Sequence, residues 1–380
     1  MYLHSDIYIS QQPKHRMNVC GDVIEFYRDS YATTIVLCDG LGSGIKANIA
    51  ANLYTARILE LVKRRVSLRE IFRTLVNTMN KIWGKDMPFS MFMVARILSN
   101  GETSVLSYEM PTPIAMQKSS VSILPVRTIT IGKALISETN CSLRNGDSLL
   151  LFSDGITMAG IGKGMVNGWT EEGIERFFND RIIHQDFSIE HLSETILDKA
   201  VAYCKKEPTD DCSVVLAHLR NGIIINILSG PPSNKDMDKQ LIDNFLSKEG
   251  IKIICGGATA KLAAREMKKS IIVQTQDLDE ITPPKYKIEG INLVTEGVVT
   301  LNQVYNLIDD PIPDGSSPVF ELLHFLNNAD RVNFITGDAR NVDAKQLVFK
   351  QKGILQRNKI IPLIAKKLEE KGKLVNIEGI

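Results

Sequence analysis

The feature that most constrains the fold is an apolar strand that runs directly into an acidic, glycine-rich turn. Residues 31–38 (YATTIVLC) predict a buried strand, and residues 39–44 (DGLGSG) follow without a spacer. From residue 45 to residue 64 apolar side chains recur every three to four positions, which predicts a helix. The Asp39 carboxylate therefore stands at the end of a buried strand, where it is costly unless it is paired or bound to a cation.

Three further places in the first half of the chain put aspartate where a strand ends or a turn begins, namely Asp22, Asp154 and the pair Asp210 and Asp211. A single Asp-Gly step is explained by turn chemistry alone. The repeated placement instead predicts a cluster of carboxylates contributed by distant parts of the chain. All-oxygen ligands suit Mg²⁺ or Mn²⁺ more than Zn²⁺. Two such ions about 3.5–4 Å apart can activate a water molecule and clamp a phosphate for in-line attack.

The pattern of strands and helices changes near residue 221. Before it, short apolar strands form a series interrupted by helices predicted over residues 45–64, 67–83, 171–178 and 189–204, which indicates an α+β layered domain. After it, strands and helices alternate strictly, including a helix expected over residues 342–349, which indicates a smaller α/β domain with a mainly parallel sheet. We therefore expect two domains, residues 1–221 and 222–380, in a chain of the α+β class.

Composition excludes several classes of function. The 380 residues carry 45 Lys+Arg and 44 Asp+Glu, so no chain-wide basic field favours nucleic acid or an anionic membrane as the main partner. No apolar run approaches the roughly 18 residues of a membrane span, and residues 1–18 lack an apolar signal core. The six cysteines form no CxxC pair, which favours reduced thiols. We expect a cytoplasmic protein.

Taken in order, four motifs resemble those of one enzyme family. They are residues 39–44 with the helix that follows, residues 90–94 (SMFMV), residues 152–156 (FSDGI) and residues 210–215 (DDCSVV). They resemble the bacterial metal-dependent (PPM-type, protein phosphatase 2C-like) serine/threonine phosphatases, and most closely the subgroup exemplified by the sporulation stage II protein E phosphatase domain. The resemblance covers about residues 15–220. It implies an αββα sandwich with two Mn²⁺ or Mg²⁺ ions between the sheets and hydrolysis of phosphoserine or phosphothreonine.

The same resemblance assigns roles to individual residues. Asp39 would bridge both metal ions, and the Gly40 carbonyl would hold one of them, directly or through water. Asp154 and Asp210 would complete one metal site, and Asp22 would serve the other. A separate orienting role is implied for Asp211, which stands where the wider family often has asparagine.

Two features of the sequence bear on how the family pattern applies. Arg16 lies near the place of the wider family's phosphate-binding arginine but one residue further away, so we expect a solvated charge instead. The helix that follows the glycine turn can move in this subgroup and so change metal occupancy. Its apolar stripe over residues 45–62 is equally what a core helix shows.

The second domain resembles no family by its motifs. Residues 251–267 predict a strand, a glycine pair and a helix, an arrangement that can hold an anion at the helix N-terminus. The stretch lacks the lysine of a P-loop and the third glycine of a dinucleotide fingerprint, so tight strand-to-helix packing is the favoured interpretation. Glu296 also stands at a strand end, at the sheet edge that ligands favour. A ligand site is a hypothesis here, made of Gly256, Gly257, Thr259 and Glu296.

Three functional hypotheses follow from these patterns. The first is a phosphatase acting on a phosphorylated regulatory protein, such as an anti-sigma factor antagonist, and regulated by the second domain, a partner or homodimerisation. The second is a non-catalytic scaffold on the same fold that binds partner proteins; such relatives usually lose metal ligands, which this sequence retains. The third is a small-molecule enzyme in the second domain, where no nucleophile–base pair can be identified.

Overall fold

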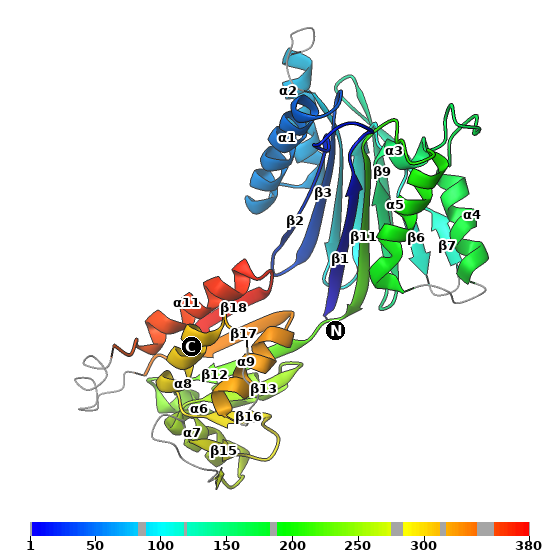
Figure 1. The fold of residues 1–380 in the computed structure, drawn as a ribbon. Coiled ribbons are helices and arrows are strands. Elements are labelled where there is room, and N and C mark those ends of the chain that lie inside the picture. The colour runs from blue at the N-terminus through cyan, green and yellow to red at the C-terminus, as the bar shows by residue number, and fades with distance from the viewer. Residues whose placement is uncertain are drawn as a thin grey trace. The chain divides into compact units, whose positions relative to one another are not determined.

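The computed structural model describes residues 2–82, 89–117, 120–182, 188–274, 284–311, 317–339 and 353–379. Their contacts divide the chain into two compact units, Tyr2–Asn221 and Gly222–Ile380. Figure 1 shows the first unit in blue to green and the second in light green to red. No helix within the described ranges has the length and apolar character needed to cross a membrane.

The first unit contains two antiparallel sheets. One has the strand order β2-β3-β4-β5-β9-β8, with β2 (Asp22–Arg28), β3 (Ala32–Gly40), β4 (Ser90–Leu98), β5 (Glu102–Tyr108), β9 (Ala134–Ser142) and β8 (Arg127–Ile131). The other has the order β1-β11-β10-β6-β7, with β1 (Leu3–Gln12), β11 (Cys212–Asn221), β10 (Ser148–Phe152), β6 (Ile114–Gln117) and β7 (Ser120–Ile123). Ile35 of the first sheet and Leu149 and Val215 of the second belong to one fully buried cluster, so the two sheets share a core.

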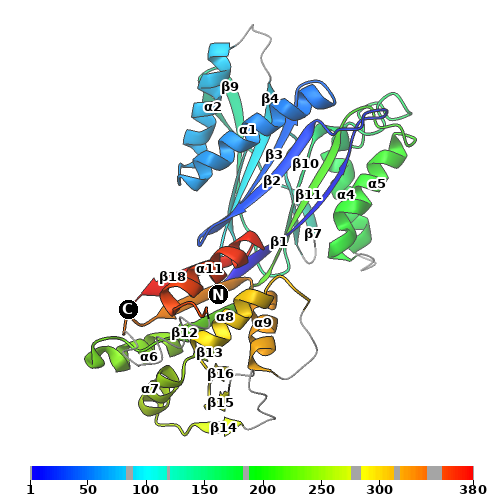
Figure 2. The same ribbon diagram turned by 60° about the vertical axis from the view of Figure 1, so that its left-hand side comes forward.

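Helices cover the outer face of each sheet (Figures 1 and 2). The helices α1 (Ile45–Lys63) and α2 (Leu68–Ile82) pack against the six-stranded sheet, where Ile58 and Phe72 join the buried cluster of Val94. The five-stranded sheet is covered by α4 (Glu171–Ile182) and α5 (Leu192–Tyr203), preceded by the one-turn helix η1 (Ile189–His191). This arrangement is the αββα sandwich that the sequence predicted.

Some elements of the first unit differ from the sequence prediction. Strands β1, β8 and β9 were not anticipated, because each carries many polar residues and gives no continuous apolar run. Asp154 does not simply end a strand, since it begins the one-turn helix α3 (Asp154–Thr157) directly after β10. Gly155 packs closely against the segment before β11, because a Cβ on it would come within 2.1 Å of the Asp211 carbonyl oxygen.

The second unit is a sheet with the order β14-β15-β16-β13-β12-β17-β18. Five strands are parallel, namely β12 (Ile224–Ser229), β13 (Ile251–Cys255), β16 (Leu293–Thr295), β17 (Arg331–Thr336) and β18 (Leu374–Gly379). The short strands β14 (Ile272–Gln274) and β15 (Lys285–Lys287) add an antiparallel edge. The prediction of a mainly parallel α/β sheet is confirmed, although β15, β17 and β18 were not anticipated.

Helices lie on both faces of this sheet (Figure 2). One face is covered by α8 (Val298–Leu307), α9 (Pro318–Asn328) and α11 (Arg357–Glu370). The other is covered by α6 (Asp238–Ser247), which η2 (Lys235–Met237) precedes, and by α7 (Gly257–Met267). The helix expected over residues 342–349 lies outside the described residues.

Candidate functional site

Two of the predicted acids are direct neighbours in the six-stranded sheet. Asp22 begins β2 and Asp39 lies one residue before the end of β3, and the two residues are partners in the antiparallel ladder. Directly opposite residues of such a ladder have Cβ atoms about 4.5–5.5 Å apart. The strand pairing therefore brings these two carboxyl groups together although 16 residues separate them in sequence.

The other acids come from the five-stranded sheet. Asp154 follows β10, and Asp210 and Asp211 precede β11, which pairs antiparallel with β10. The charges of these acids also affect the pKa of a carboxyl group in the six-stranded sheet. Burial, and then the charges of Asp22, Asp154, Asp210 and Asp211, raise the pKa of Asp39 to about 9. Acids from both sheets therefore raise the pKa of the same carboxyl group, that of Asp39.

The neighbouring carboxyl groups are perturbed in the same direction. Burial raises the pKa of Asp22 to about 7, with smaller contributions from Asp211 and Asp154, while hydrogen bonds from Ser213 and Ser153 oppose the rise. Burial and the Asp210 charge also raise the pKa of Asp154. Buried carboxyl groups that lie this close together are costly unless protons or a cation offset their charge.

Hydrogen bonding leaves two of the buried carboxylate oxygens free. Asp22 Oδ2 accepts from Ser213 Oγ at 2.6 Å, but Asp22 Oδ1 has no partner within the described part of the chain, and neither has Asp154 Oδ1. Buried polar atoms in native proteins nearly always have partners. Two orphaned anionic oxygens fit a hard divalent cation, which takes oxygen ligands.

The side chains do not enclose a cation as they stand. Over the described residues, no group of three or more His, Cys, Asp or Glu side chains is arranged so that it could hold a metal ion. The fit to a metal therefore rests on the chemistry of the donors, their convergence and the two free oxygens.

The start of α1 lies against the turn that carries Gly40. A Cβ on Gly40 would come within 1.9 Å of the Ala47 carbonyl oxygen, so only glycine allows this approach. Ser90 Oγ donates to the Asp39 carbonyl oxygen at 2.7 Å, which fixes the backbone on the other side. The first turns of α1 and the acidic turn are consequently one packed unit.

Comparison with known proteins shows which family this chain belongs to. The family model of stage II sporulation protein E (SpoIIE) matches residues 29–220. The chain belongs to the SpoIIE family. The match includes Asp39, Asp154 and Asp210, whereas Asp22 precedes it. A search among curated proteins finds no matching sequence.

Several solved structures resemble parts of this chain. The PP2C phosphatase domain with a regulatory-domain fragment of SpoIIE from Bacillus subtilis has 15% identity and a TM-score of 0.50, over 58% of this chain and 64% of that chain. The RsbU and RsbW domains of a Mycobacterium tuberculosis protein have 12% identity and a TM-score of 0.49, over 64% and 68%. The M. tuberculosis serine/threonine phosphatase PstP/Ppp has 14% identity and a TM-score of 0.41, over 58% and 100%. The likeness to the B. subtilis domain establishes a PPM-type phosphatase fold for the first unit.

In the SpoIIE-family unit, the loop before β2 contacts the acids. Asp211 Oδ1 accepts from the backbone N–H of Lys14 at 2.9 Å. Burial raises the pKa of Asp210, and the hydrogen bond from the Asp211 backbone N–H and then the Lys14 charge oppose this rise. Arg16 is exposed and has a φ of 68°. Its charge makes only a small contribution to the lowered pKa of Glu207, after those of Lys163 and His15. The contact of Lys14 with Asp211 was not predicted, because nothing in the local sequence distinguishes Lys14 from Arg16.

The residues singled out in the second unit lie after neighbouring parallel strands. Gly256 caps α7 and Gly257 begins it directly after β13, while Glu296 follows β16. Thr259 Oγ1 accepts from the Gly230 N–H at 2.8 Å. This bond ties α7 to the end of β12, as tight strand-to-helix packing requires. A ligand at this edge stays a prediction.

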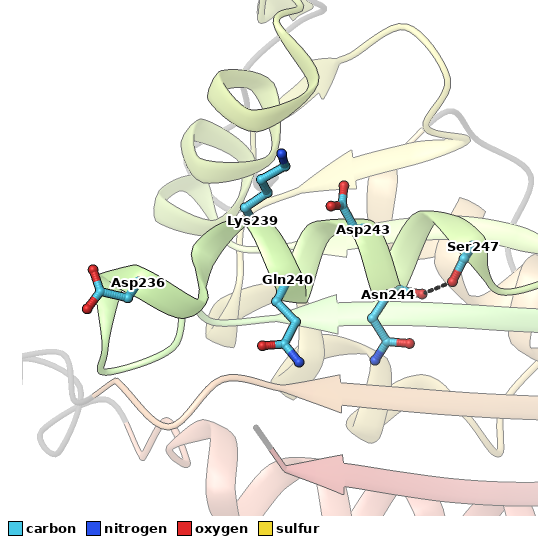
Figure 3. Close-up of a pocket in the computed structure, with 6 residues that line it drawn as sticks. All are labelled: Asp236, Lys239, Gln240, Asp243, Asn244 and Ser247. Atoms are coloured by element: carbon cyan, nitrogen blue, oxygen red, sulfur yellow. Dashed lines mark hydrogen bonds between the residues drawn. The ribbon is translucent and has the colours of Figure 1, made fainter.

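One hollow of the surface lies in the second unit. It measures about 620 Å³, runs along η2 and α6 (Figure 3) and is lined by Asp236, Lys239, Gln240, Asp243, Asn244 and Ser247. All six side chains project from one helical segment, and none of them belongs to the sets that the sequence singled out.

Proposed function

We propose that the unit Tyr2–Asn221 is a metal-dependent phosphatase that hydrolyses phosphoserine or phosphothreonine on a regulatory protein. The observation that carries the proposal is the convergence of buried carboxyl groups from both sheets, with the free oxygens Asp22 Oδ1 and Asp154 Oδ1. The SpoIIE-family fold supports the same class of reaction.

The residues that would hold two Mn²⁺ or Mg²⁺ ions are Asp22, Asp39, Asp154, Asp210 and the Gly40 carbonyl group. When bound, such ions would lower the pKa of a water molecule and offset the charge of a phosphate ester during in-line attack. The chain itself supplies carboxylate oxygens at the ends of strands from two sheets, with Asp22 buried and Asp39, Asp154 and Asp210 partly buried. Asp211 would orient this set through its bond to the Lys14 N–H.

The phosphorylated partner is inferred from the family and not from a surface feature. We propose a small regulatory phosphoprotein, such as an anti-sigma factor antagonist, as the substrate class, and a regulatory role for the unit Gly222–Ile380. A phosphoproteomic comparison of a deletion strain with its parent would identify the substrate, because its phosphoserine or phosphothreonine should accumulate in the deletion strain.

Hydrolysis of p-nitrophenyl phosphate tests the catalytic proposal. The full chain should release phosphate with Mn²⁺ but not after chelation, and Asp39→Asn should reduce the rate by more than about 100-fold. Asp198→Asn removes an exposed acid of α5 and is the matched control, expected to keep the wild-type rate. Equal rates for wild type and Asp39→Asn would refute the proposed centre, and the absence of any turnover would favour a non-catalytic scaffold.

A further inference from the structure

Behind the acids, a chain of hydrogen bonds runs from β1 through β11 to β2. Gln11 Nε2 donates to Ser213 Oγ at 2.9 Å, and Ser213 Oγ donates to Asp22 Oδ2 at 2.6 Å. Ser213 is fully buried and Asp22 is 3% exposed. Gln11 and Ser213 are ladder partners, so the pairing register of β1 and β11 fixes the first of these contacts.

The chemistry of the donors and acceptors fixes which atom donates in each of these hydrogen bonds. An ionised carboxylate can only accept, and a serine hydroxyl has one proton to give. Because the Gln11 amide nitrogen donates to the hydroxyl oxygen, the Ser213 proton is available for Asp22. The Ser213 backbone N–H donates to Ser153 Oγ at 3.0 Å, which anchors Ser213 independently of its hydroxyl group.

These hydrogen bonds make the two carboxylate oxygens of Asp22 unequal. The hydroxyl group of Ser213 holds Oδ2, while Oδ1 is buried without a partner in the described residues. A short charge-assisted bond of this kind restricts rotation of the carboxylate. Oδ1 is therefore the oxygen of Asp22 that has no hydrogen bond, whereas Oδ2 already accepts from Ser213.

We infer that Ser213 is a positioning residue that orients the Asp22 carboxylate toward a divalent cation, and that Gln11 sets the direction of the Ser213 hydroxyl. The inference rests on the proposed function, since it needs Asp22 to be a metal ligand. Neither residue is required to contact the substrate. Partners that orient metal ligands typically change metal affinity by about 10–100-fold when they are removed.

Four variants of the full chain separate this role from simple packing. Ser213→Ala removes the hydroxyl group, while Ser213→Thr keeps it. Gln11→Glu replaces the donor with an acceptor of the same shape, which draws the Ser213 proton away from Asp22 and also removes the longer bond from Gln11 Nε2 to the Asp22 carbonyl oxygen at 3.4 Å. Gln12→Glu adds the same negative charge on the next residue of β1 and is the matched control.

The measurement is the Kd for Mn²⁺ by calorimetric titration, together with the melting temperature of the metal-free chain. We expect the Kd to rise about 10–100-fold in Ser213→Ala and to rise in Gln11→Glu despite its added negative charge. Ser213→Thr and Gln12→Glu should stay within about threefold of wild type. If Ser213 served only to pack the core, Ser213→Ala would lower the melting temperature of the metal-free chain and leave the Kd for Mn²⁺ unchanged.

A wild-type Kd in Ser213→Ala would overturn the inference. Should Ser213→Ala fail to fold, Gln11→Glu decides, and a Kd equal to that of Gln12→Glu would overturn it equally. Failure of the proposed function is recognised separately, because wild type would then bind no Mn²⁺, or Asp39→Asn would bind it as tightly as wild type. Either of those results removes the inference as well.

Discussion

Asp39 is surrounded by groups that oppose its ionisation. Its carboxyl group is largely buried beside four other aspartates, and its pKa rises from the ordinary value of 3.8 to about 9. Asp22, its partner across the ladder, shifts to about 7. Residues of this kind destabilise a fold unless protons or cations offset them, and they are retained where function requires them.

A pH prediction follows for the metal-free chain. A carboxyl group with a raised pKa in the folded state stabilises that state fully below its unfolded value, and this stabilisation is lost as the pH rises through the folded value. For Asp39 the loss spans pH 3.8 to about 9. With a chelator present, the melting temperature of wild type should therefore fall more steeply over this window than that of Asp39→Asn, measured by scanning calorimetry. Parallel curves for the two proteins would contradict the assigned electrostatics.

At the scale of elements, the start of α1 depends on Gly40. Gly40→Ala would place a methyl group 1.9 Å from the Ala47 carbonyl oxygen, so the helix backbone must move. We expect a loss of about 1–3 kcal/mol of stability together with loss of Mn²⁺-dependent turnover. The control is Gly257→Ala at the start of α7, where no atom lies within 4 Å of the added Cβ. Denaturant unfolding measures both variants, and an unchanged midpoint for Gly40→Ala would disprove the close approach.

A ladder of asparagine side chains joins the parallel strands of the second unit. Asn333 Nδ2 donates to Asn226 Oδ1 at 2.9 Å, and Asn376 Nδ2 donates to Asn333 Oδ1 at 3.0 Å, in register across β12, β17 and β18. Asn226 is fully buried and Asn333 is 5% exposed. The ladder fixes the strand register, because a shift by one residue would bury these amides without partners.

Asn333→Ala should destabilise the second unit by about 1–3 kcal/mol, since two neighbouring amides lose a partner. That loss corresponds to roughly 2–4 °C in melting temperature for each kcal/mol. Asn244→Ala, at an exposed position of α6, should leave the melting temperature within about 1 °C of wild type. If both variants melt at the same temperature, the ladder does not stabilise the sheet.

At the scale of the whole molecule, the chain consists of two units with separate cores. We expect calorimetry to resolve two transitions, of which Mn²⁺ raises only the one that Asp39→Asn also affects. Asn333→Ala should lower only the other transition. A single transition that responds equally to Mn²⁺ and to Asn333→Ala would show that the two units unfold cooperatively.

The sequence predicted those features that depend on local pattern. Asp39 and Asp154 could be found because each follows a long apolar run, and the sandwich followed from motifs in a known order. Ser213 and Gln11 could not be found, because their roles arise from a pairing register that brings residues 11, 22 and 213 together. Polar strands such as β9 were missed for a related reason, since their stability comes from neighbouring strands and not from their own apolar residues.

The central claim is that acids from both sheets jointly bind divalent cations. Crystals of the full chain grown with Mn²⁺ and measured at the manganese absorption edge test it most directly. We expect two anomalous peaks bounded by Asp22, Asp39, Asp154 and Asp210, with one peak beside Asp22 Oδ1. Peaks that lie only elsewhere, or the absence of any peak at these carboxylates under saturating Mn²⁺, would contradict it.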